Sequence, residues 1–283
     1  MNPDLSIVVV TYKENLAILK ACFDSVYASE GVSYELIVSD NGQNDATEGL
    51  LKSYDGVKYV RNEGNLGFAA AVNVGMGHRN GRYVLLLNPD TSFKPDVLAK
   101  MVKHLDRNPK VGIGSSVIRY PNGDLQDSIR RFPSMKDQLL ILLKVPHLLK
   151  TRAVDKYMMK DMDPMKTQDV DSIMGAFMFI REELIQDIGL FDERYFIWYE
   201  EVDYCKMASD AGWKIRHYAD VEITHHKGHT FSKLATIRKQ KWIRESLRKY
   251  MKKHHGIIPW LFLWMMNAPF VGLAYAVSIV KPK

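Results

Sequence analysis

The first 90 residues alternate between short apolar runs and segments in which apolar residues recur with helical spacing. β-Branched and aliphatic residues dominate the runs, which is typical of buried strands. We therefore expect strands at residues 5–11, 35–40, 57–60 and 82–87. Helices are expected between them, at residues 15–28, 47–54 and 68–79. Strands that alternate with helices at this spacing predict an α/β fold with a mainly parallel, doubly wound sheet.

The pattern is less regular after residue 90. We expect a helix at 95–106, strands at 111–118 and 174–180, a helix starting near Arg181 and another at 202–211, with Gly212 as its C-cap. Residues 120–170 are predicted to be irregular, with basic and Met-rich pieces. Together, residues 1–232 are interpreted as one domain.

The C-terminal part, residues 233–283, has a different character. Residues 233–253 are rich in Lys and Arg, and residues 257–280 form a 24-residue stretch without charge, which is long enough to span a bilayer. Pro259 and Pro269 interrupt it, and a proline inside a helix kinks it. We interpret this part as a basic helix followed by an apolar, membrane-associating helical extension. An in-plane anchor is slightly favoured over a span, and the alternative is a pair of short helices that complete the core.

Composition narrows the class of protein further. Hydrophobic residues make up 46% and charged residues 25% of 283 residues, so a disordered chain is disfavoured. The net charge is +6, but the basic residues precede an apolar segment and not a base-stacking platform, which disfavours nucleic-acid binding. Cys22 and Cys205 give no disulfide framework, so we expect a reducing compartment. The N-terminal residues are expected to form the first strand and not a signal peptide.

Polar residues stand at the carboxyl ends of the predicted strands, where open α/β sheets bind their ligands. Asp90 follows such a strand, and a carboxylate there suits Mg²⁺ or Mn²⁺ bound together with a diphosphate. From its position alone, an N-cap or an Asx-turn is equally consistent. Asp40 could accept hydrogen bonds from a base or a ribose, although Asn41-Gly42 is also a strong turn pair. Thr11 and residues 62–65 complete this group.

A second acidic cluster, Glu200, Glu201 and Asp203, follows an aromatic run at 195–199. Carboxylates beside apolar rings tend to have a raised pKa, which suits a general base near neutral pH. The alternative is a helix N-terminus, which acidic residues stabilise.

The positions of the histidines and glycines argue against two other classes of protein. His225, His226 and His229 form HHxxH without the Glu of a zinc hydrolase, although one imidazole could complete a metal site at Asp90. The glycines at 75, 77 and 81 follow a helix and not a strand, which disfavours a dinucleotide-binding Rossmann site.

The order of the motifs over about residues 4–232 resembles the inverting glycosyltransferases of family 2, which have the GT-A fold, and especially their bacterial rhamnosyltransferase-like branch. The segments that carry the resemblance are SIVVVTYK, VSDNGQNDAT, NEGNLGFAAAVNVGM, LLLNPDTSF, the long MGAFMFIREELIQDIGLFDERYFIWYEEVDYC with AGWKI, and ITHHKGHTFSK.

The resemblance implies roles for individual residues of the nucleotide and metal site. Thr11 and Asp40 would line the nucleotide pocket, with Asp40 at the pyrimidine base, and Asn65 would lie against the nucleotide. Asp90 would be the retained carboxylate of the DxD metal motif, which here reads Asn-Pro-Asp and lacks its first acid. His225 would be the added ligand of Mg²⁺ or Mn²⁺.

On the acceptor side the resemblance implies that Glu201 is the catalytic base. Gly175 and Ala176 would border the acceptor, and Trp198 could hold a sugar face and exclude water.

The implied reaction is an inverting transfer of a sugar, L-rhamnose from dTDP-L-rhamnose or a sugar from a UDP-sugar, to a saccharide acceptor. A lipid-linked acceptor at the cytoplasmic face of the membrane would fit the C-terminal part. Two rivals remain. A sugar nucleotidyltransferase usually has a Gly-rich loop after its first strand, which VVVTYKEN lacks. A non-catalytic nucleotide-sugar binder would require Glu201 to be incidental.

Overall fold

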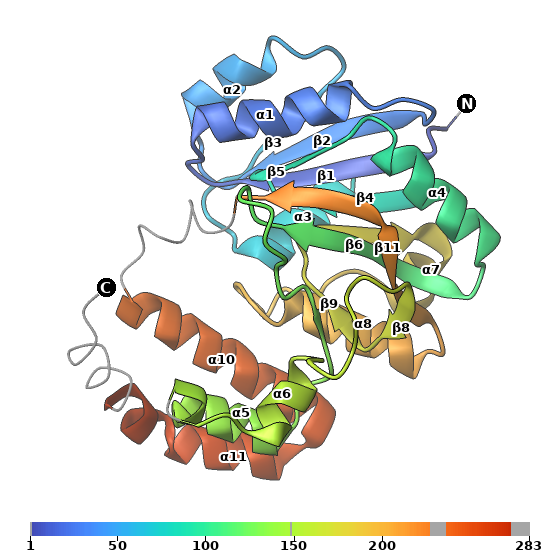
Figure 1. Cartoon of the computed structure of the whole chain (residues 1–283). Coiled ribbons are helices and arrows are strands. Elements are labelled where there is room, and N and C mark those ends of the chain that lie inside the picture. The colour runs from blue at the N-terminus through green and yellow to red at the C-terminus, as the bar shows by residue number, and fades with distance from the viewer. Residues whose placement is uncertain (1, 148, 227–235, 273–283) are drawn as a thin grey trace.

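The computed structural model describes residues 2–147, 149–226 and 236–272, and is built around a nine-stranded sheet (Figure 1). Across the sheet the strands are β3 (Lys58–Arg61), β2 (Tyr34–Asp40), β1 (Leu5–Thr11), β4 (Tyr83–Leu87), β10 (Phe177–Arg181), β6 (Val111–Arg119), β11 (Lys214–His225) and β5 (Thr91–Phe93). The short strand β8 (Gln168–Val170) also pairs with β11.

Most of the sheet is parallel, as the sequence predicts. The strands β3, β2, β1 and β4 are parallel to one another, and β6 is parallel to β11. Strand β10 runs antiparallel to both β4 and β6 and joins these two parallel groups.

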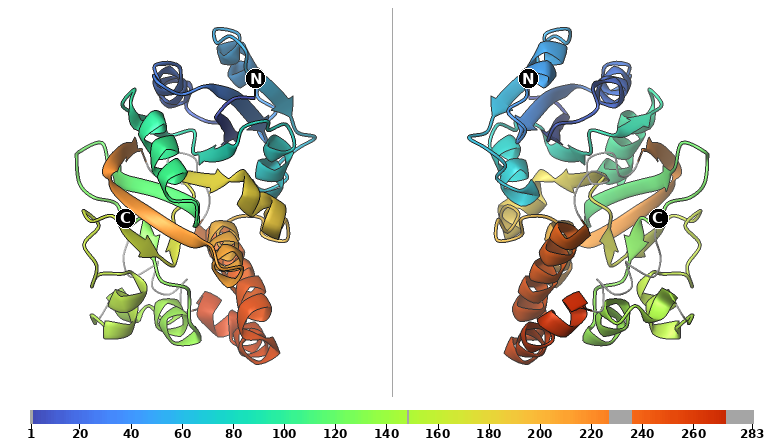
Figure 2. Two further views of the ribbon diagram at one scale, coloured as in Figure 1. Left: turned by 90° about the vertical axis from the view of Figure 1, so that its right-hand side faces the viewer. Right: turned by 90° about the vertical axis from the view of Figure 1, so that its left-hand side faces the viewer.

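Helices cover both faces of the sheet because side chains alternate along each strand. In β1, Ile7 and Val9 belong to one buried cluster, and Val8 and Val10 to the other. The first cluster includes side chains of α1 (Leu16–Tyr27), α2 (Asp45–Leu51) and α4 (Val97–Arg107). The second includes side chains of α3 (Phe68–Met76), α7 (Glu182–Ile188) and α8 (Glu200–Asp210). The two views of Figure 2 show this doubly wound arrangement, which confirms the predicted fold class.

The expectation that residues 120–170 are irregular is wrong in part. This segment holds β7 (Ile129–Arg130), α5 (Met135–Leu142), the 3₁₀ turn η1 (Val145–His147) and α6 (Arg152–Tyr157), while β9 (Ser172–Ile173) follows and pairs with β7. Helix α5 begins with a capping box in which Ser134 and Asp137 each accept a hydrogen bond from the other's backbone N–H. Helix α8 also starts earlier than expected, at Glu200.

The C-terminal helices α10 (Thr236–His255) and α11 (Ile257–Met265) gather beside α5 and α6, away from α1 and α2 (Figure 1). A third buried cluster joins Leu247 and Tyr250 of α10 to Val202 of α8. The carboxylate of Asp203, also on α8, lies 2.7 Å from both Lys253 Nζ and His254 Nε2. Helix α10 is therefore attached to α8 by apolar contacts and by buried charges.

The apolar stretch 257–280 is only partly described, because residues 273–280 lie outside the described ranges. Among the helices that the structure does describe, none combines the length and the hydrophobicity needed to cross a bilayer. Leu263 and Phe270 are buried, in line with the core-completing alternative, but Ile258, Trp264 and Met265 are 78%, 61% and 63% exposed. Membrane association of residues 257–280 as a whole stays a prediction, as does a domain boundary at residue 232.

Candidate active site

Thr11 and Asp40 end two neighbouring parallel strands and are register partners. The Thr11 hydroxyl donates to Asp40 Oδ1 over 2.9 Å. The fully buried Asp40 carboxylate also accepts from Gly42 N, Asn44 N and the Tyr59 hydroxyl, at 2.8, 3.0 and 2.8 Å. A carboxylate has about four acceptor sites, so these four donors occupy all of the hydrogen-bond acceptor sites of Asp40. Asp40 therefore fixes the loop after β2, and contact with a base would require one of these bonds to be exchanged.

Asn65 lies in a loop that buried amides hold in place. Asn41 Nδ2 donates to Gly67 O over 3.0 Å, and the exposed Asn65 accepts from Gly67 N over 3.0 Å. Gly67 has a φ of +88°, and a Cβ there would stand 2.6 Å from the carbonyl oxygen of Phe196. Only glycine fits this approach, which holds the Asn65 loop against the aromatic segment 195–199. No local sequence pattern indicates a buried role for Asn41.

Asp90 and His225 are brought together by the pairing of β5 with β11, in which Thr91 is the partner of His225. Asp90 Oδ1 lies 3.1 Å from His225 Nε2, and both side chains are largely buried. The neighbouring Asn88 Nδ2 lies 3.3 Å from the same ring nitrogen. Residues 135 positions apart in sequence thus converge at the carboxyl end of β4. His229 lies outside the described residues.

Gln126 fixes the orientation of the His225 ring. Its Nε2 donates to His225 O over 2.7 Å, so its Oε1 is the atom 3.0 Å from His225 Nδ1. Because Oε1 can only accept, Nδ1 carries the proton, and in a neutral ring Nε2 turns a lone pair toward Asp90. Gln126 is a residue that the sequence reasoning missed, since it lies in the segment predicted to be irregular.

The Asp90–His225 pair fits a divalent cation. Adjacent ligands of an octahedral ion at about 2.1 Å stand about 3.0 Å apart, close to the observed separation of 3.1 Å. In the described part of the chain no group of three or more His, Cys, Asp or Glu side chains offers a further metal site. Two protein ligands are sufficient where phosphate oxygens and water supply the others, as is common for Mg²⁺.

Glu201 lies in the first turn of α8, a helix that begins directly after two residues with left-handed backbone. Trp198 has a φ of +64° and Tyr199 a φ of +72°, which is uncommon and strained for bulky residues. The Tyr199 hydroxyl donates to Gln138 Oε1 of α5 over 2.8 Å. A Cβ added to Gly175 would stand 3.5 Å from Glu201 Cβ, so the Gly175 backbone lies against Glu201.

One stretch of backbone connects Glu201 with the Asp90–His225 pair. Ala176 follows Gly175, and its carbonyl accepts from Asn88 N over 2.9 Å. Asn88 in turn contacts His225, as described above. The predicted base and the predicted metal ligands therefore share a wall. The Ala176 side chain is buried, so only backbone at that position can face a ligand.

Two adjacent carboxylates at this wall are desolvated. Oε2 of Glu200 and Oε2 of Glu201 are both buried and, among the described residues, have no hydrogen-bond partner. Burial, and then the charge of Glu201, raise the pKa of Glu200 well above its ordinary value. Burial also raises the pKa of Glu201, while the positive charge of Arg130 on β7 opposes this shift. Such a pair favours one protonated and one ionised carboxylate, and the more buried Glu200 is the better candidate for the proton.

The fold defined by this sheet is that of the GT-A glycosyltransferases. The chain is similar over its full length to a mannosyltransferase of Pyrobaculum calidifontis solved in complex with GDP-Man and Mn²⁺, with a TM-score of 0.61 and 17% identity over 77% of that chain. It is also similar to TarS of S. aureus in complex with UDP-GlcNAc, with a TM-score of 0.57, 16% identity and coverage of 88% and 65%. At these identities the likeness concerns the fold alone.

The chain belongs to glycosyl transferase family 2, whose sequence profile matches residues 6–189. Two curated relatives confirm the rhamnosyltransferase-like branch. N-acetylglucosaminyl-diphospho-decaprenol L-rhamnosyltransferase of Mycobacterium tuberculosis is 26% identical over 242 residues, which cover 81% of this chain and 78% of that protein. Rhamnosyltransferase WbbL of Escherichia coli K12 is 25% identical over 232 residues, which cover 78% and 83%.

Proposed function

We propose that this protein is a metal-dependent, inverting glycosyltransferase that moves L-rhamnose from dTDP-L-rhamnose to a lipid-linked saccharide in cell-surface polysaccharide synthesis. A UDP-sugar is the alternative donor. The observation that carries the proposal is the wall formed by Gly175, Ala176 and Asn88, which joins desolvated Glu201 to the Asp90–His225 pair.

The acceptor class follows from a relative and from the surface of the C-terminal helices. The mycobacterial relative is named for an acceptor in which a diphosphate links the sugar to a polyprenol. Exposed Ile258, Trp264 and Met265 on or next to α11, together with the basic helix α10, support an approach to an anionic membrane surface. We place the enzyme at the cytoplasmic face of that membrane.

Asp90 and His225 would hold Mg²⁺ or Mn²⁺, which when bound would offset the negative charge of the diphosphate leaving group. Glu201 accepts the proton of an acceptor hydroxyl as that oxygen attacks the anomeric carbon from the face opposite the diphosphate. The new C–O bond forms while the bond to the diphosphate breaks, which inverts the anomeric configuration. The aromatic segment 195–199 would exclude water that otherwise hydrolyses the donor.

The proposed base predicts the pH dependence of transfer. Glu201 must be ionised to accept a proton, so kcat/KM rises with pH as Glu201 ionises, and burial places this limb above the ordinary carboxyl pKa of 4.5. Arg130 lowers the pKa of Glu201, so Arg130→Gln should move the limb to higher pH. The control is Arg131→Gln, because the guanidinium of Arg131 instead pairs with Asp161 over 3.0 Å. A limb unmoved in Arg130→Gln would contradict this assignment.

The orientation of His225 by Gln126 predicts a loss of metal affinity on substitution. Gln126→Leu removes the acceptor for Nδ1–H and should weaken Mn²⁺ binding by about 10–100-fold, the usual effect of losing an outer-shell partner. Mn²⁺ is titrated in the presence of dTDP and followed by calorimetry. Gln168→Leu, whose amide donates to Asp163 O outside this site, is the matched control. Equal Mn²⁺ affinities in the two variants would remove Gln126 from the site.

The function itself is tested with a panel of donors and a diphosphate-lipid-linked N-acetylglucosamine acceptor. We expect rhamnosyl transfer from dTDP-L-rhamnose that requires Mn²⁺ or Mg²⁺, is lost with EDTA, and gives inverted product by NMR. Transfer from a UDP-sugar alone would establish the alternative donor. Release of pyrophosphate from a nucleoside triphosphate and a sugar phosphate would instead favour a nucleotidyltransferase. Donor binding without transfer to any acceptor would favour a non-catalytic binder.

A further inference from the structure

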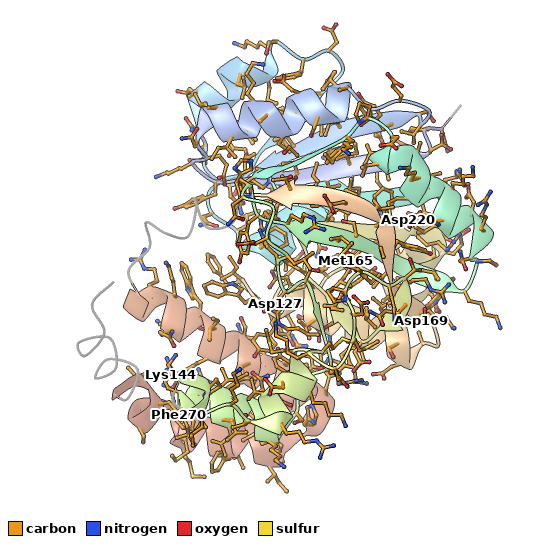
Figure 3. The ribbon with its side chains drawn as sticks, viewed as in Figure 1. Asp127, Lys144, Met165, Asp169, Asp220 and Phe270 are labelled. Atoms are coloured by element: carbon orange, nitrogen blue, oxygen red, sulfur yellow. The ribbon has the colours of Figure 1, made fainter. Side chains whose placement is uncertain are left out.

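Three cationic side chains gather where the end of α5 meets α10. They are Lys144, two residues after α5, and Arg244 and Arg248 on α10. Lys144 and Phe270, the latter bonded to Arg244, are labelled in Figure 3 at the end of the molecule that α5, α10 and α11 form. We call Lys144, Arg244 and Arg248 the cation cluster.

The hydrogen bonds of the cation cluster go to neutral groups. Arg244 is 3% exposed and donates to Gln240 O over 3.1 Å and to Phe270 O over 3.0 Å. Its Nε is buried without a partner among the described residues. Arg248 donates to Asn267 Oδ1 over 2.8 Å.

Carboxylates do not neutralise the cluster within the described ranges. Glu245 is the acidic residue whose charge reaches Arg248, but its carboxylate pairs with Lys249 over 3.0 Å. Burial lowers the pKa of Lys144, Arg244 and Arg248, and repulsion from Arg244 and Arg248 adds to this shift at Lys144 and Arg244 respectively. A buried cation such as Arg244 is unfavourable beside other cations unless an anion pairs with it, and among the described residues the cluster has no carboxylate counter-ion.

A narrow slot lies beside the cluster. Arg244, Arg248 and Asn267 supply its polar lining, and Leu142, Leu263 and Phe270 supply apolar lining. In this structure the slot is too narrow for a water molecule. Lys144 and Arg248 are only half-buried, so they are the parts of the cluster that an anion can reach from solvent.

Two contacts connect the helices that carry the cluster with the segment that carries Glu201. Tyr199, two residues before Glu201, bonds to Gln138 of α5, and Gln138 is six residues before Lys144. Helix α10 also approaches the site, because the Ser246 hydroxyl donates to Ile197 O over 2.8 Å. The helices α5 and α10 therefore both connect the cluster with the segment that carries Glu201, and α11, with its exposed apolar side chains, packs against α10.

We propose that the cation cluster binds the diphosphate of a polyprenyl-diphosphate-linked acceptor whose sugar hydroxyl lies at Glu201. This inference rests on the proposed function and adds a site that positions the acceptor by its phosphates. Arginine and lysine donate strong, charge-assisted hydrogen bonds to phosphate oxygens, and the buried Arg244 Nε–H offers an unused donor. The polyprenyl chain would leave along the apolar side chains of α11.

Binding of farnesyl diphosphate, a short isoprenoid diphosphate, tests the cluster without turnover. The double variant Lys144→Gln/Arg248→Gln should weaken binding about tenfold, as measured by calorimetry. It loses charge-assisted hydrogen bonds to the diphosphate, each of which contributes to the binding free energy. The matched control is Lys241→Gln/Lys252→Gln, which removes the same charge from exposed positions of α10 and should bind within about twofold of the unmodified protein. Weak binding of farnesol, which lacks phosphate, should be equal in all proteins. Equal losses in variant and control, or no loss in either, would overturn the proposal.

Two further measurements separate the possible failures. Lys144→Gln alone, at a side chain with a half-buried amine, should fold as the unmodified protein does and weaken binding about threefold, so a misfolded double variant leaves the test intact. Loss of binding to phosphatidylglycerol vesicles with unchanged affinity for farnesyl diphosphate would assign the cluster to bilayer lipid and refute the proposal.

In turnover, the double variant should raise KM for the lipid-linked acceptor about tenfold with little change in kcat. Transfer with an unchanged acceptor KM would refute the cluster and leave the proposed function standing. Cluster-dependent binding of farnesyl diphosphate in a protein that transfers no sugar would refute the function instead.

Discussion

Replacing Glu201 by glutamine should slow sugar transfer by about 10²–10⁴-fold while leaving the affinity for the nucleotide sugar unchanged. The substitution keeps the shape of a side chain that lies against Gly175 and removes its ability to take a proton. Donor affinity should persist because Asp90 and His225 are untouched. Single-turnover transfer and donor binding by calorimetry measure the two quantities separately.

Glu200→Gln is the matched control, since it makes the same chemical change one residue earlier. The pKa of Glu200 is raised in the folded state by burial, so its ionisation destabilises the fold as the pH rises through that folded pKa. An amide avoids this cost, and we expect Glu200→Gln to fold at least as well as the unmodified protein and to retain most of its activity. Transfer at an undiminished rate in Glu201→Gln, or equal losses in both variants, would contradict the role of Glu201.

Asp90→Asn should abolish metal-dependent stabilisation by the donor and lower kcat by about 10²–10³-fold, the usual cost of losing one stabilising group for a developing charge. The amide keeps a contact with His225 but loses the negative charge that attracts a divalent cation. A ligand at 100 times its dissociation constant stabilises a protein by about 2.7 kcal/mol, which a thermal shift with and without Mn²⁺ detects.

The control for Asp90→Asn is Asp220→Asn. Asp220 lies on the same strand as His225 but pairs with His104 over 2.8 Å and is largely exposed (Figure 3). It should leave the Mn²⁺-dependent shift intact. The metal assignment would be wrong if Asp90→Asn showed the same Mn²⁺-dependent shift as this control.

The sequence predicts the parallel half of the fold because its strands and helices alternate locally. It does not predict the antiparallel insertion of β10 or the small β7–β9 pair, since both depend on contacts between distant segments. Helix α5 does have a local signal, because Ser134 is followed three residues later by Asp137 in a capping box.

The site shows the same limit. The Asp90–His225 contact arises from the antiparallel pairing of β5 with β11, which no local pattern reveals, so only the resemblance to a family anticipated it. Gln126 and Arg130 lie in the segment predicted to be irregular, where a polar residue has no distinguishing signal. The four donors around Asp40 likewise come from three separate chain segments, and sequence alone could not place them.

The contacts of α10 with Asp203 couple the position of α10 to that of α8. Asp203 lies on α8 two residues after Glu201 and is 1% exposed. Its carboxylate contacts the side chains of Lys253 and His254 on α10. A force that tilts α10 must therefore break these contacts or rotate α8 with it. Docking of the C-terminal helices on a surface would consequently change the orientation of α8 and of the Glu201 carboxylate that it carries.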